Sequence, residues 1–230
     1  MAGRLMIWHL YAWPPTAHVV GSTDALFTRA EITSLTFGDL IEHGLDSPRG
    51  REILRFVNRS HRSTPVTVEH NRFALVALAV TLIRWLDRYG KRPLTPPERA
   101  ALLRFYAELG RRMGVRDFPA DPSAYLADCE ASFAFTEAGR LCSERTLAMT
   151  RARVHPWLRS LVGPVISALL QPSVRDAVGL PHPSGAIQYS VLAVLRIRRH
   201  VVRWLPARTT PTTPRTRRTK SLSAGPQSAI

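Results

Sequence analysis

The sequence is poor in cysteine. It has only Cys129 and Cys142, thirteen positions apart. Because there is no second pair, this spacing matches neither a zinc site nor a disulfide framework. A chain of 230 residues can bury most of its apolar surface without such cross-links. The scarcity of cysteine favours a reduced, cytoplasmic compartment.

Long apolar runs are also missing. The longest are residues 73–83 and the proline-interrupted residues 161–170, whereas a spanning helix needs about 20 apolar residues. The apolar start of the chain, Leu5–Trp8, is interrupted at once by His9 and then by Pro14 and Pro15. The sequence therefore predicts no membrane-spanning helix and no secretory signal.

Acidic residues are absent from the C-terminal end. The net charge is +15, but no Asp or Glu follows Asp176, and nine basic residues do. The excess charge is therefore concentrated after Asp176. Nearly all basic residues are arginines, which fits either a coding bias or contact with phosphates or a membrane. Nucleic-acid binding is disfavoured, because few aromatic residues lie among the cations and no recognised module is present.

Common catalytic motifs are lacking as well. The chain contains no Gly-rich phosphate loop, no Gly-x-Ser-x-Gly, no His-Glu-x-x-His and no Cys-x-x-Cys-His. Glu98, Glu108 and Glu130 fall on different predicted helices. The sequence alone does not pair any of them as acid and base.

What is present is helical periodicity with clear capping signals, and no segment alternates with period two. These signals place helices at about residues 29–43, 48–62, 67–89, 95–113, 121–153, 156–170, 172–179 and 183–205. Gly90 is expected to be a left-handed cap. Because Phe73–Ile83 is apolar on all sides, it is expected at the centre of the protein.

The predicted fold is all-α, a single-domain bundle of about six to eight helices around that central apolar helix. Residues 1–24 show no clear periodicity and are expected to be irregular. Residues 25–205 form the predicted domain. Residues 206–230, rich in Thr, Pro, Arg and Ser, are expected to be a disordered basic tail.

The helix at residues 48–62 carries the first candidate site. Leu54, Val57, Asn58 and His61 share one face, so Asn58 and His61 would enter the core together and need partners. A neutral His can bind a metal or haem iron, and a neighbouring Asn can hydrogen-bond a bound ligand. The alternative is a structural pair at the end of a helix.

Three further features leave alternatives open. Arg55 and Arg59 flank the stripe and either bind a carboxylate or form a solvated face. His70, in the first turn of the apolar helix, is either a polar first-turn residue or a second ligand. The basic helix at residues 183–205 suits an anionic membrane surface, or equally a packed terminal helix with an arginine-rich outer side.

An ordered run of motifs resembles the MpaB-type oxygenase family. That family is named for an endoplasmic-reticulum-bound oxygenase of mycophenolic acid synthesis and is related to rubber oxygenase, the latex clearing protein. The similarity covers about residues 30–205. The matching motifs are Asp46-Ser47-Pro48-Arg49-Gly50-Arg51, Arg55-x-x-Asn58-x-x-His61, Arg84-Trp85-x-x-Arg88-Tyr89-Gly90-x-Arg92-Pro93, Glu98-Arg99-x-Ala101, Glu108-x-Gly110-Arg111-Arg112-Met113-Gly114 and Pro119.

The resemblance implies an all-helical oxidoreductase. In the rubber oxygenases it implies haem b and O₂-dependent cleavage of a hydrophobic alkene. By that analogy His61 is the expected iron ligand and His70 a second cofactor-binding position, with Arg55 and Asn58 as catalytic residues. The expected partners are a hydrophobic small molecule and O₂. One departure is that Phe73–Ile83 contains no histidine, where haem-binding relatives are expected to have one. The competing hypothesis is a non-catalytic helical protein that binds a lipid or a membrane surface through its basic last helix. The expected location is the cytoplasm, with association with a membrane left open.

Overall fold

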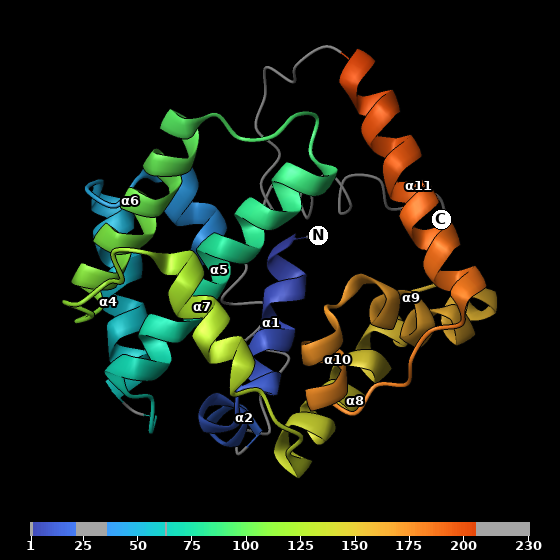
Figure 1. Ribbon diagram of the computed structural model, residues 1–230. Coiled ribbons are helices and arrows are strands. Elements are labelled where there is room, and N and C mark those ends of the chain that lie inside the picture. The colour runs from blue at the N-terminus through green and yellow to red at the C-terminus, as the bar shows by residue number, and fades with distance from the viewer. Residues whose placement is uncertain (1, 22–35, 63, 206–230) are drawn as a thin grey trace, which may run out of the picture. The chain divides into compact units, whose positions relative to one another are not determined.

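The computed structural model describes residues 2–21, 36–62 and 64–205 (Figure 1). All regular secondary structure in these ranges is helical, which confirms the all-α prediction. The described residues belong to two compact units. One contains residues 36–62 and 64, and the other contains residues 2–21 and 65–205. The predicted tail, 206–230, lies outside the described residues.

The smaller unit consists of two helical segments joined by a tight turn. Residues 36–43 are helical and stop at Gly44, which has a φ of 77°; the start of the predicted helix at 29–35 lies outside the described residues. Helix α4 (Pro48–Arg62) follows. As predicted, Ser47 and Pro48 open it, and the Ser47 hydroxyl accepts the Gly50 N–H at 2.8 Å. An ion pair of 3.2 Å between Arg49 and Asp39 joins the two segments.

Helix α5 (Val68–Tyr89) is the central element of the larger unit. It packs against α1 (Ala2–Ala12), α6 (Pro96–Arg112) and α7 (Pro122–Ala131). No side chain of the apolar run Phe73–Ile83 is exposed. The central position predicted for this run is therefore confirmed, because a helix that is apolar on all sides must be covered on all sides.

The prediction that residues 1–24 are irregular is wrong for residues 2–21. They form α1 and α2 (Pro14–Gly21), and α1 packs on α5, α8 and α10. Trp8 and Tyr11 are buried, and the Tyr11 hydroxyl lies 3.0 Å from Thr146 Oγ1. The sequence of α1 shows no helical periodicity because neighbours cover the helix on several sides. Its apolar residues therefore do not form one stripe.

The single helix predicted for 121–153 is also wrong. The structure has two, α7 and α8 (Glu137–Ala152), separated by residues 132–136. Thr136 caps α8 by accepting the Gly139 N–H at 3.0 Å. Within the break, the Ala134 N–H donates to the carbonyl of Ala12 at 3.3 Å. Contact with α1 thus satisfies backbone groups that a continuous helix would have paired internally.

The connection between α5 and α6 explains part of the motif string that resembles the oxygenase family. Gly90 is not the predicted left-handed cap, because its φ is −70°. A glycine is required there for a different reason: a Cβ would overlap the carbonyl oxygen of Leu86. The Asp87 carboxylate then accepts the Leu94 N–H at 3.0 Å and fixes the path of the chain.

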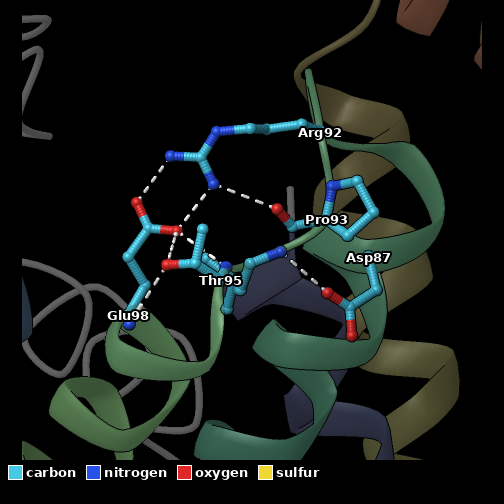
Figure 2. A network of polar contacts seen from close by, with 6 residues as sticks. Asp87, Arg92, Pro93, Thr95 and Glu98 are labelled. Carbon is cyan, nitrogen blue, oxygen red and sulfur yellow. Dashed lines mark hydrogen bonds and ion pairs between the residues drawn. The ribbon is translucent and has the colours of Figure 1, made fainter.

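Figure 2 shows the start of α6 in detail. Thr95 and Glu98 form the predicted capping box, each side chain accepting the other's backbone N–H. Arg92 adds a two-pronged contact to the Glu98 carboxylate, at 2.6 and 2.7 Å. This part of the motif string therefore serves the turn and the helix start.

The C-terminal part of the larger unit is built from four short to medium elements. They are the 3₁₀ helix η1 (Pro156–Leu161), α9 (Val162–Leu169), α10 (Pro172–Ala177) and α11 (Gly185–Trp204). Helix α11 packs on α9 and on α5. None of the helices in the described ranges has the length and apolar character needed to cross a bilayer.

Candidate functional site

Helix α4 carries three of the four predicted site residues. Ile53 and Leu54 are buried, Asn58 and His61 are half-buried, and Arg55 is exposed. The Nδ1 atom of His61 is shielded from solvent. Asn58 and His61 lie one turn apart on the same side of α4, as the i, i+3 spacing requires. The stripe predicted from the sequence is therefore present.

His70, the fourth predicted site residue, takes part in a capping box at the start of α5. Its Nδ1 accepts the Thr67 N–H at 3.2 Å, and its own N–H donates to the Thr67 hydroxyl at 3.2 Å. Burial lowers the pKa of His70, against a smaller opposing effect of Glu69, so the ring tends to be neutral. With Nδ1 accepting, the neutral ring carries its proton on Nε2. In this tautomer His70 has no lone pair free to bind iron.

His61 belongs to the smaller unit and His70 to the larger one. The structure therefore does not join the two predicted cofactor-binding histidines in one described site. Their roles stay predictions.

A buried polar cluster in the larger unit was missed by sequence reasoning. His9 on α1 is 3% exposed, and its Nε2 lies 3.5 Å from the carboxylate of Glu130 on α7. Arg84 on α5 contacts the same oxygen at 2.6 Å. Within the described ranges, neither ring nitrogen of His9 makes a hydrogen bond. The 3.5 Å from Nε2 to Glu130 is longer than a well-formed hydrogen bond.

Contacts with His9 and Arg84 keep Glu130 ionised in this cluster. Burial alone would raise the pKa of its carboxyl, but His9 and Arg84 together outweigh burial and hold the pKa below its usual value. A carboxylate beside a histidine can accept or pass on a proton. The three residues are far apart in the sequence, so only the packing of α1, α5 and α7 reveals the cluster.

The other carboxylates considered from the sequence are structural. Glu98 pairs with Arg92, and Glu108 pairs with Arg111 and Arg112. Hydrogen bonds from these arginines lower the pKa of Glu98 and of Glu108 to about 2. Both therefore stay ionised and are poor general acids. In the described part of the chain, no three His, Cys, Asp or Glu side chains gather as a metal site would require.

Described residues of the larger unit line two surface cavities that bear on the site. One of about 480 Å³ lies between α11 and the α5–α6 connection and is lined mainly by basic residues. The other, of about 240 Å³, lies between α6 and the segment from Phe118 to Pro122. Neither is lined by His9, His61 or His70.

Comparison with known families decides the assignment. Residues 7–204 match the family described as ER-bound oxygenase mpaB/B′/rubber oxygenase, catalytic domain. The chain belongs to this oxygenase family. The match runs through both compact units, and it confirms the resemblance drawn from the motifs. None of the curated proteins matches the chain.

Membership of the family indicates an oxygenase-type function. The match begins at residue 7, within α1, so it extends beyond the predicted domain start at residue 25. The helices that bury Trp8 and Tyr11 thus belong to the family's catalytic domain.

Proposed function

We propose that the protein is a haem-dependent oxygenase that acts on a hydrophobic small molecule with O₂. The observation that carries the proposal is the family match over residues 7–204, which includes the α4 stripe as well as the helices of the larger unit. The donor set on α4 fits haem in its chemistry. It offers an imidazole with a solvent-shielded nitrogen, an amide one turn away and an exposed guanidinium.

Each residue of this donor set has a distinct role. The haem iron would supply the activation of O₂. His61 would hold the iron through a ring nitrogen, and its Nδ1 is shielded from solvent. Asn58 would donate its amide N–H to a bound ligand. Arg55 would bind a haem propionate, whose carboxylate matches the guanidinium in a two-pronged geometry.

The cluster of His9, Glu130 and Arg84 has no assigned part in this proposal.

His70 could act as a second iron ligand only if its ring gave up the hydrogen bond from the Thr67 N–H. We therefore expect His61 to dominate iron binding, and loss of His70 to affect mainly the start of α5.

The test is the visible spectrum of the full chain, purified with haem available. We expect a Soret band with stoichiometric iron, lost in His61→Ala and retained in His155→Ala, an exposed histidine beside η1. Circular dichroism establishes that both variants fold. A folded protein without haem would disprove haem dependence. A Soret band unchanged in folded His61→Ala would disprove the role of His61.

A further inference from the structure

Helix α11 exposes a row of apolar side chains. Val194, Ile197, Val201 and Trp204 follow one another at spacings of three, four and three residues, so they form one stripe along the helix. All four are exposed, Trp204 to 83%. Leu195, which is buried, marks the side of α11 that packs on the protein. The apolar row therefore lies on a side of the helix directed toward solvent.

A group of cations lies beside this row. The cavity of about 480 Å³ is lined by Lys91 and Arg92 from the α5–α6 connection and by Arg196, Arg199, His200 and Arg203 from α11. In the described part of the chain, only Arg92 among these side chains pairs with a carboxylate, that of Glu98. Because no acidic residue follows Asp176 in the sequence, α11 carries no counter-charge of its own.

The cationic group is held in place by hydrogen bonds. Arg199 donates to the carbonyl of Arg88 at 2.9 Å, and Lys91 donates to the carbonyl of Leu205 at 2.7 Å. These bonds join α11 to the end of α5 and to the α5–α6 connection. At 3.6 residues per turn, Arg196 and Arg203 lie on one flank of the apolar row, with His200 between them and the row.

We propose that α11 docks the protein onto the surface of a membrane that contains anionic phospholipids. In this arrangement Val194, Ile197, Val201 and Trp204 enter the boundary between headgroups and acyl chains, while the cations of the cavity bind lipid phosphates. Charge complementarity selects this occupant: an apolar row alone would fit many partners, but a row flanked by exposed arginines without carboxylates fits an anionic interface. Tryptophan at the end of the row is typical of side chains at that depth. The proposal does not rest on haem binding.

The test is co-sedimentation of the full chain with vesicles. One set contains phosphatidylcholine alone, and in the other phosphatidylglycerol replaces part of the phosphatidylcholine. We expect binding only to the anionic vesicles, and weaker binding as salt is raised, because salt screens exposed charges. Binding to neither set would overturn the proposal, as would binding to a DNA duplex without binding to the vesicles.

Two variants separate the apolar and the cationic contributions. Ile197→Ser/Trp204→Ser should lower the apparent binding constant at least about tenfold, through lost apolar burial. Arg196→Ala/Arg203→Ala should lower it about 25-fold, at about fivefold per arginine. All four substituted side chains are exposed, so the fold should survive.

Matched controls come from elsewhere on the larger unit. Trp157→Ser removes another exposed tryptophan, and Arg104→Ala/Arg116→Ala removes the same charge from exposed positions. Both should bind within about twofold of the parent chain. If the controls lose as much affinity as the α11 variants, or the α11 variants lose none, the proposal is wrong. Because these variants leave α4 untouched, the Soret band reports on the haem proposal separately.

Discussion

At the scale of single residues, burial separates Glu130 from Glu137. Glu137 pairs with Arg140 while remaining largely exposed. The Glu130 side chain is 14% exposed and shares one oxygen with Arg84 and His9. An exposed pair gains little because water screens it, whereas a buried carboxylate depends on its partners. Glu130 should therefore contribute to stability in a way that Glu137 does not.

Glu130→Gln should lower the free energy of unfolding by about 1–3 kcal/mol at neutral pH. The native pKa of Glu130 lies below the value of 4.5 expected in the unfolded chain. Its contribution is thus fully present above about pH 4.5 and is lost as the pH falls through the native pKa. Urea titrations at several pH values should show the gap between parent and variant closing on acidification. Glu137→Gln should change stability little at any pH, and a pH-independent gap for Glu130→Gln would contradict the argument.

At the scale of elements, the approach of α8 to α1 depends on one glycine. A Cβ at Gly139, in the first turn of α8, would overlap the carbonyl oxygen of Tyr11 on α1. The same turn is held by Thr136, whose hydroxyl accepts the Gly139 N–H. The cap and the interhelix contact therefore meet at one residue, and neither can shift without the other.

We expect Gly139→Ala to destabilise the protein by about 1–3 kcal/mol, despite the higher helix propensity of alanine, because the backbone must move to admit a methyl group. The matched change is Gly185→Ala at the start of α11, where a Cβ would meet no atom within 4 Å. There alanine should be neutral or slightly stabilising. Thermal denaturation of both variants is the measurement. Equal effects at the two sites would rule out the close contact as the cause.

At the scale of the larger unit, α1 is shared by two apolar clusters. Trp8 and Tyr11 pack with residues of α8–α10 such as Leu147 and Val174. Met6 of α1 and Trp13, which directly follows α1, pack with residues of α5 and α7 such as Phe73. The N-terminal helix thus connects the central α5 to the C-terminal helices, and the larger unit depends on it.

Trp8→Ala should cost about 3–5 kcal/mol of unfolding free energy, since it empties a buried site that the neighbours cannot refill. Trp157→Ala is the matched control, because Trp157 is 69% exposed, and it should change stability by at most about 0.5 kcal/mol. Chemical denaturation followed by circular dichroism measures both. A small effect of Trp8→Ala would show that α1 is not required for the packing of α5 against α8–α10.

Much of the fold could be predicted from short-range signals. Thr67, Thr95 and Ser47-Pro48 mark helix starts correctly, and Gly44 and Gly114 mark stops. The α4 stripe with Asn58 and His61 also follows from spacing on one helix. By contrast, the conformation of Gly90 could not be predicted, because a glycine serves a left-handed turn and a close backbone contact equally well.

The sequence by itself determined the helical class, the central place of Phe73–Ile83 and the family. Each depends on residues within a few turns of one another, or on the order of motifs along the chain. Only the tertiary structure decided that residues 2–21 form helices, that α7 and α8 are separate, and that His9, Arg84 and Glu130 meet. Burial from several sides and charge pairing across the fold depend on which distant segments pack together, and periodicity along one segment does not record that.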